Sequence, residues 1–148
     1  RREVYKSVID GQDAKSLLNE FSRVMPVLPQ KSVIYLTGNT NYYNYMNHPV
    51  PLQLDPGYIL MVWYYKSKTI PNELLISKER LWGFGNQWYY EFDGKGFGYY
   101  WDKGALVNDL VAGKFLISQV ISLYYDGSTK KLINNTDDFH AYLKSFIK

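Results

Sequence analysis

The chain has 148 residues, of which 46% are hydrophobic and 21% are charged, and its formal net charge is +3. This composition is typical of one globular domain, and a chain of this length can bury a hydrophobic core without disulfide bonds or bound metals. A disulfide scaffold and a thiolate metal site are excluded because the sequence has no cysteine. Acidic and basic residues alternate along the chain, a pattern that does not indicate duplex-DNA binding.

The longest uninterrupted apolar or aromatic run, residues 58–65, is far shorter than the roughly 20 residues that span a bilayer. No membrane span is therefore predicted. The chain begins at Arg1 without methionine, which we interpret as a processed or trimmed product whose signal peptide would already be absent. Both a cytoplasmic and an exported location fit, and the first is slightly favoured.

The N-terminal part predicts a helix followed by a strand. Asp13 is the expected N-cap, and Pro26 and Pro29 end the helix. Residues 31–37 (KSVIYLT) are rich in β-branched and aromatic side chains, which predicts a strand. The apolar positions that give the helix its period of about 3.6 residues are Ala14, Leu17, Leu18, Phe21 and Met25.

The middle of the chain predicts a polar loop and two strands. Residues 38–49 combine asparagine, glycine and tyrosine without a formal charge, which indicates a loop. Residues 58–66 and 73–82 are predicted strands, each preceded by a proline-containing turn.

Residues 81–104 hold ten of the twenty-six aromatic residues and predict a hairpin. A four-residue loop 93–96 would pair Phe92 with Phe97, and a two-residue Asp93-Gly94 turn would shift the partners; either register stacks aromatics across the strands. With the first register one face carries six aromatics, which are expected to be core covered by one of the two helices: Trp88, Tyr90, Phe92, Phe97, Tyr99 and Trp101. The competing interpretation is that the opposite face exposes Tyr89 and Tyr100 for stacking.

The C-terminal part predicts a helix over 105–112 closed by Gly113, and a strand over 115–125. Asp126-Gly127 predicts a two-residue hairpin turn into a strand over 130–133. Residues 135–138 would cap a last helix. Its core-facing stripe follows 0, 3, 4, 7 spacing: Phe139, Tyr142, Leu143 and Phe146.

Taken together, these elements predict a single α+β domain over residues 1–148. The expected sheet is mostly antiparallel, with the N-terminal helix and the C-terminal helix packed on it. We find no internal repeat, linker or low-complexity segment.

Catalytic motifs are missing from the sequence. His48 and His140 are the two histidines, and Asp137 with His140 forms one i, i+3 pair without a second cluster to complete a metal site. Neither a Gly-x-Ser-x-Gly elbow nor a His-Glu-x-x-His motif occurs. We therefore expect a binding protein without cofactor or metal rather than an enzyme.

Two aromatic surfaces are candidates for partner binding. In the polar loop, Tyr42, Tyr43 and Tyr45 lie among asparagines, a combination of rigid rings and adaptable amides found in recognition surfaces; the alternative is an ordinary loop with its tyrosines against the sheet. On the hairpin, Trp82, Tyr89 and Tyr100 would form an exposed outer face. The first hypothesis is a protein partner, and the second is carbohydrate or single-stranded nucleic acid stacked on these rings.

One resemblance adds to this interpretation. The segments LWGFG (81–85), WYYEFD (88–93), YYWD (99–102) and DFHAYL (138–143) resemble the later half of SUKH-superfamily immunity proteins, and Leu28-Pro29 resembles the end of that family's first helix. The resemblance implies a protein that neutralises a partner protein. The chain departs from the family after Pro29, where a strand is predicted instead of a helix and Gly38-Asn39 reverses the family's Asn-Gly order.

Overall fold

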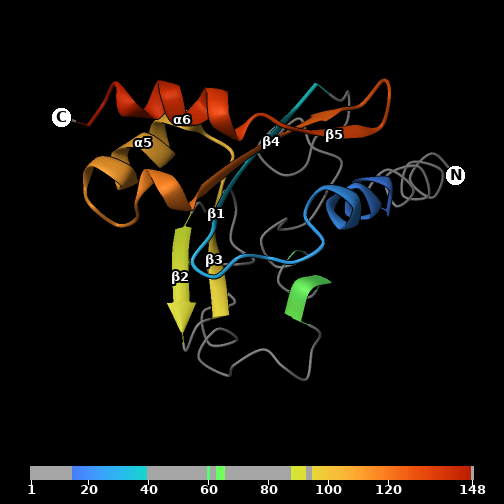
Figure 1. Cartoon of the computed structure of the whole chain (residues 1–148), viewed down its shortest axis with the longest axis horizontal. Helices are drawn as coiled ribbons and strands as arrows, with labels where there is room; N and C mark the ends of the chain where they lie inside the picture. Colours follow the sequence, from blue (N-terminus) through green and yellow to red (C-terminus); the bar gives the residue numbers. More distant parts are fainter. Residues whose placement is uncertain (1–14, 40–59, 61–62, 66–87, 93–94, 148) are drawn as a thin grey trace, which may run out of the picture.

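The structure is a computed structural model that describes residues 15–39, 60, 63–65, 88–92 and 95–147, and for residues 88, 90–92 and 95 it describes the backbone. In this part of the chain a five-stranded sheet lies between helices on both of its faces (Figure 1). The α+β class predicted from the sequence is confirmed.

The sheet has the strand order β2-β3-β1-β4-β5. Its strands are β1 (Val33–Gly38), β2 (Trp88–Phe92), β3 (Lys95–Tyr100), β4 (Val120–Asp126) and β5 (Lys131–Asn134). The three central strands run parallel to one another, and an antiparallel hairpin partner forms each edge. The prediction of a mostly antiparallel sheet is therefore wrong, and the sheet is mixed.

The parallel centre follows from the burial of β1 on both faces. Val33, Ile34, Tyr35 and Leu36 are all buried, and a strand covered on both sides is a continuous apolar run rather than an alternating one. From β3 the chain crosses over β1 through helix α5 (Lys103–Val111) before it returns as the parallel strand β4. A parallel return needs such a helical crossover.

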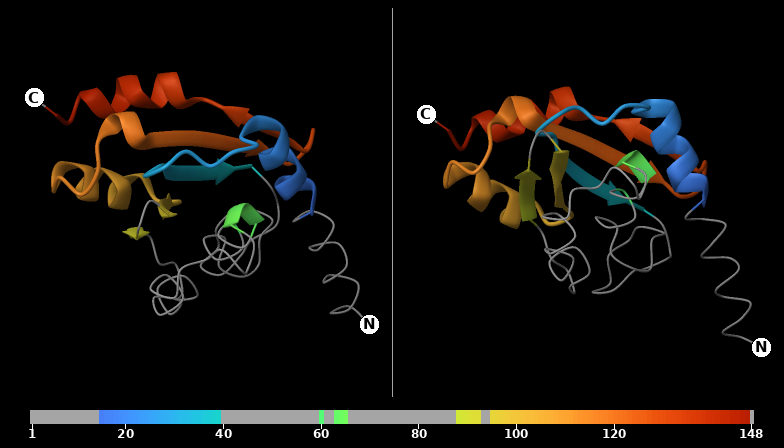
Figure 2. Two further views of the ribbon diagram at one scale, coloured as in Figure 1. Left: turned by 60° about the horizontal axis from the view of Figure 1, so that its bottom comes forward. Right: turned by 90° about the horizontal axis from the view of Figure 1, so that it is seen from below.

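Two apolar cores lie on the two faces of the sheet. On one face the helix of residues 15–24 covers a core that also receives Leu60. On the other face α5 and α6 (Thr136–Lys144) lie side by side (Figure 2). Alternation along β1 supplies both cores, because Ile34 and Leu36 point to the first and Val33 and Tyr35 to the second.

Several local predictions need correction. Residue 60 and residues 63–65 are helical, so the predicted strand over 58–66 is wrong there, since a short apolar run suits a buried helix equally well. A 3₁₀ turn, η2 (Ile117–Gln119), precedes β4 and shortens the strand predicted from residue 115. The predicted strand over 73–82 lies outside the described residues.

The turn lengths of the β2–β3 and β4–β5 hairpins both differ from those first predicted. Phe92 pairs with Lys95, so the hairpin has the two-residue Asp93-Gly94 turn that was the alternative register. Asp126 pairs with Lys131, so four residues connect β4 to β5 instead of the two predicted. The Asp126 carboxylate accepts hydrogen bonds from the backbone and side chain of Ser128, which holds this longer turn.

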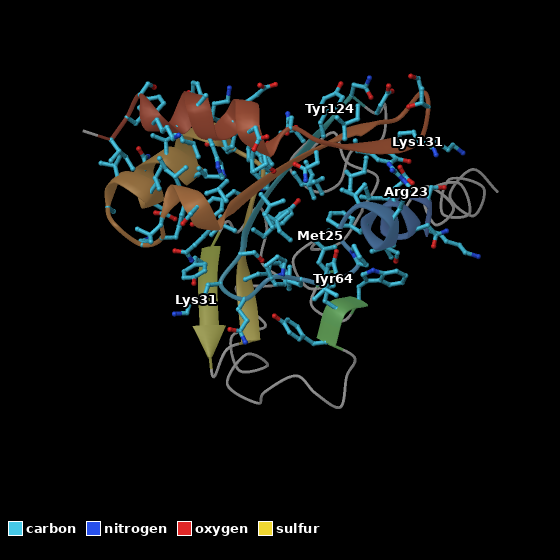
Figure 3. All side chains as sticks on the ribbon, viewed as in Figure 1. Arg23, Met25, Lys31, Tyr64, Tyr124 and Lys131 are labelled. Atoms are coloured by element: carbon cyan, nitrogen blue, oxygen red, sulfur yellow. The ribbon has the colours of Figure 1, made fainter. Side chains whose placement is uncertain are left out.

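An ion pair covers the outer edge of β5 at Leu132. Glu20 Oε1 accepts a hydrogen bond from the N–H of Leu132 at 2.8 Å, and Arg23 Nη2 donates to the C=O of the same residue at 3.1 Å. Glu20 and Arg23 also form a salt bridge of 2.8 Å, and Arg23 lies beside the Lys131 end of β5 (Figure 3). The pair therefore satisfies both outward-facing backbone groups of Leu132, as a sixth strand would.

Candidate functional site

The structure places two of the six predicted partner-binding residues. Tyr42, Tyr43, Tyr45 and Trp82 lie outside the described residues. Tyr89 lies on β2 and Tyr100 at the end of β3. Gly98 rather than Tyr100 is the cross-strand partner of Tyr89, which follows from the shorter turn of the hairpin.

Tyr100 is buried, so the prediction that it forms part of an exposed outer face is wrong. Its exposed fraction is 0%, because α5 packs over this end of β3. Its hydroxyl donates a hydrogen bond to Asp109 on α5, and Lys114 pairs with the same carboxylate at 3.0 Å. Burial and the neighbouring carboxylate raise the pKa of Tyr100 far above its usual value. Tyr100 thus anchors a helix and offers no ring to a ligand.

Tyr89 is half-buried against the same core. Its ring centroid lies 6.0 Å from that of Phe115, and its hydroxyl accepts a hydrogen bond of 3.3 Å from Gln119 Nε2. Gln119 also donates to the backbone C=O of Lys31 at 2.7 Å. These contacts hold the Tyr89 ring against the sheet.

His140 is engaged by the backbone. Its Nε2 lies 2.7 Å from the C=O of Val120, a contact that ties α6 to the start of β4. Among the described residues no group of three or more His, Cys, Asp and Glu side chains gathers as a metal site would require. Within the same ranges no helix is both long and apolar enough to cross a membrane.

A row of aromatic rings leads from the core to the surface along α6 and into the turn that follows it. The Tyr35 and Phe139 rings stack with centroids 4.6 Å apart, Phe139 and Tyr142 stack at 5.8 Å, and Tyr142 meets Phe146 edge-on at 5.1 Å. Exposure rises along the row, from 7% for Phe139 to 39% for Tyr142 and 44% for Phe146. Only the inner half of the predicted core-facing stripe is therefore buried.

We name the exposed end of this row, Tyr142, Phe146 and Ile147 together with Lys103, the α6 aromatic surface. The Lys103 Nζ lies 4.6 Å from the centroid of the Tyr142 ring, a cation–π distance. Ile147 is 44% exposed. The surface thus joins two aromatic rings, an aliphatic side chain and a positive charge at the C-terminal end of the chain, where α6 forms the outer layer (Figure 2).

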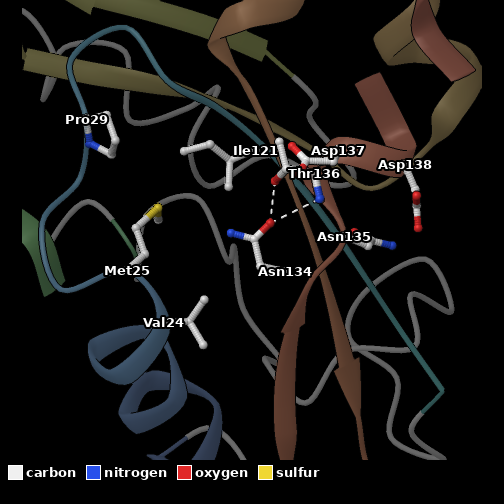
Figure 4. Close-up of a pocket in the computed structure, with 9 residues that line it drawn as sticks. All are labelled: Val24, Met25, Pro29, Ile121, Asn134, Asn135, Thr136, Asp137 and Asp138. Atoms are coloured by element: carbon white, nitrogen blue, oxygen red, sulfur yellow. Dashed lines mark hydrogen bonds between the residues drawn. The ribbon is translucent and has the colours of Figure 1, made fainter. Parts of the chain in front are cut away.

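A pocket of about 670 Å³ lies at the other end of α6. The end of the N-terminal helix flanks it on one side and the first turn of α6 on the other, and the amide nitrogen of Asn134 points into it (Figure 4). We name it the β5 pocket. Four apolar and five polar residues line it: Val24, Met25, Pro29, Ile121, Asn134, Asn135, Thr136, Asp137 and Asp138.

Asn134 is fixed at the pocket by the start of α6. Its side-chain oxygen accepts hydrogen bonds from the N–H of Thr136 at 3.0 Å and from the Thr136 hydroxyl at 2.5 Å. The expected cap, Asn135, makes no side-chain hydrogen bond to the helix. Because the oxygen of Asn134 is used in capping, its amide group is left to face the pocket as a hydrogen-bond donor.

Sequence reasoning missed Lys103 and the lining of the β5 pocket. Ile121 and Asn134 lie on the neighbouring strands β4 and β5, and Val24, about one hundred residues earlier in the chain, meets them because the N-terminal helix packs on this face of the sheet. One signal was present: Asn134 precedes a helix start, where asparagine serves as a cap.

Comparison with known proteins gives no relative: no protein-family model, curated protein or solved structure matches this chain.

Proposed function

We propose that the chain is a non-catalytic protein-binding domain that contacts its partner through the α6 aromatic surface. The observation that carries the proposal is the row of rings that begins in the core at Tyr35 and ends exposed at Tyr142 and Phe146. Tyrosine and other large aromatic side chains dominate the binding energy of protein interfaces. The non-catalytic part of the proposal rests on the sequence, which has two histidines and no cysteine.

The rigidity of the row favours binding. Phe139 is 7% exposed and stacks on Tyr142, so the exposed ring is held by the core before a partner arrives. A side chain that is already ordered loses little conformational entropy on association.

The geometry favours a protein partner over a stacked base or sugar. The stacked Phe139 ring and the Lys103 ammonium group already contact the π-face of Tyr142. A planar ligand would have to displace Lys103 to stack there. A protein side chain can pack against the exposed edges of Tyr142 and Phe146 while Lys103 keeps its contact.

The experiment compares three immobilised proteins: the wild type, the double variant Tyr142→Ser/Phe146→Ser, and Lys144→Ala as a matched control on the last turn of α6. Proteins captured from the source organism by the first and the third are purified and titrated. We expect the double variant to bind such a partner at least about 30-fold more weakly, the effect of losing roughly 2 kcal/mol at a hot spot. Equal affinity of all three proteins for every partner would contradict the proposal.

An inhibitor or immunity protein is a more specific form of this proposal, which the SUKH resemblance implies. It adds one expectation: the partner is itself active, and its activity falls as the complex forms. A titration of the partner's activity with the wild type and with the double variant tests this form separately.

A further inference from the structure

The hydrogen-bond pattern of β5 leaves one backbone position open beside the β5 pocket. Just after β5, the N–H of Asn135 donates to the C=O of Ser122 at 3.0 Å, and the N–H of Ser122 donates to the Thr136 hydroxyl at 3.0 Å, so the backbone of Asn135 faces β4. Residues that face the partner strand alternate along an antiparallel ladder with residues that face away from it. The N–H and C=O groups of Leu132 and Asn134 therefore face the outer edge of the sheet.

The two outward-facing positions differ. At Leu132 both groups are bonded by the Glu20–Arg23 pair. At Asn134 the same alternation turns the backbone N–H and C=O outward, and the hydrogen bonds that the Glu20–Arg23 pair makes to β5 go to Leu132 instead. An unpaired strand edge is a template for pairing with another extended chain.

The pocket surrounds this open position with complementary groups. Val24, Met25 and Ile121 give it an apolar wall, and Met25 is 6% exposed. Asp137 and Asp138, both in the first turn of α6, give it two carboxylates. An apolar side chain fits the wall, and a basic side chain next to it fits the carboxylates.

We propose that the β5 pocket binds an extended segment of a protein in which an apolar residue adjoins a lysine or arginine. One residue of the segment pairs with the backbone N–H and C=O of Asn134, in the manner of strand addition. The Asn134 amide group donates to a second carbonyl of the segment. The inference shares with the proposed function only that the ligand is a protein, and the pocket lies at the opposite end of α6 from the α6 aromatic surface.

Short peptides test the proposal on the isotope-labelled protein by amide chemical shifts. The probe is acetyl-Ser-Lys-Val-Lys-Ser-amide. A second peptide replaces both lysines with glutamate, and a third carries N-methyl-valine, which removes one backbone donor. We expect the basic peptide to shift the Asn134 amide signal at about millimolar concentration, and the N-methyl peptide to bind about tenfold more weakly, as the loss of one hydrogen bond predicts.

The variant Asp137→Asn/Asp138→Asn separates charge from shape. We expect it to lose the preference for the lysine peptide over the glutamate peptide, while Asp102→Asn, which neutralises a carboxylate at the N-cap of α5, keeps it. Equal shifts with all three peptides, or an Asn134 signal unmoved by the lysine peptide, would overturn the proposal. Neither result bears on Tyr142 and Phe146, so failure here leaves the proposed function standing.

Discussion

Replacing Glu20 by alanine should destabilise the protein, because its carboxylate holds the edge of β5. The substitution removes the salt bridge to Arg23 and leaves the buried N–H of Leu132 without an acceptor. An unsatisfied buried donor costs about 1–3 kcal/mol. The exposed side chain of Arg23 is 53% accessible, so solvent screens the ionic part. We expect a loss of about 2 kcal/mol in the free energy of unfolding at pH 7.

The contact between Glu20 and Arg23 also predicts how the free energy of unfolding depends on pH. The hydrogen bond from Arg23 lowers the pKa of Glu20 from 4.5 to about 2 in the folded protein. A depressed carboxyl pKa contributes stability that is complete above pH 4.5 and is lost as the pH falls toward 2. The difference in free energy of unfolding between the wild type and Glu20→Ala should therefore become smaller as the pH falls from 4.5 toward 2.

Urea unfolding monitored by circular dichroism measures both effects, at pH 7 and again near pH 3. Ser22→Ala is the control, since Ser22 is exposed on the same helix and its loss should change the free energy by less than about 0.5 kcal/mol. The reasoning is refuted if Glu20→Ala unfolds like this control at pH 7, or if its stability gap is the same at both pH values.

Three further substitutions test the packing by the same unfolding assay. Gly98→Ala would bring a Cβ atom to 3.1 Å from the Tyr89 ring and should cost about 1–2 kcal/mol; a neutral result would show that the hairpin yields easily. Tyr100→Phe removes the hydrogen bond to Asp109 and should cost about 1 kcal/mol, whereas an exposed Tyr100 would give no change. Asn134→Ala removes the side-chain oxygen that caps α6 and should lower the free energy of unfolding by about 1 kcal/mol. An unchanged free energy of unfolding would show that Asn134 does not stabilise the start of α6.

Elements whose signals are local could be predicted from the sequence. The helix predicted over 105–112 is α5, with Gly113 in the left-handed region at φ +81 as a closing glycine requires. The strand predicted over 31–37 is β1, and the last helix begins within a residue of its predicted cap. In each case propensity, capping and periodicity agree.

The direction of the strands was predicted wrongly because it depends on distant segments. Val33-Ile34-Tyr35-Leu36 is a continuous apolar run, which is typical of a parallel strand buried on both faces, and this signal was available. The antiparallel prediction followed chain neighbours, whereas β1 pairs with β3 and β4, which lie more than sixty residues further along. The apolar run indicates that β1 is buried on both faces, but it does not identify the distant strands with which β1 pairs.

In the candidate sites, too, local features could be predicted and features that depend on distant segments could not. The ring spacing on the last helix was predicted, but its exposure depends on where the helix leaves the sheet, so Tyr142 and Phe146 were assigned to the core. Tyr100 was predicted at the surface because the packing of α5 on the end of β3 has no signal in the local sequence. The β5 pocket joins segments about one hundred residues apart, and no spacing rule reaches that far.

In the function proposed above, the α6 aromatic surface binds a partner protein. The most direct test is calorimetric titration of a captured, purified partner with the wild type, with Tyr142→Ser/Phe146→Ser and with Lys144→Ala. We expect a dissociation constant at least about 30-fold larger for the double variant, and one close to that of the wild type for Lys144→Ala. Equal dissociation constants for the wild type and a folded double variant would contradict it.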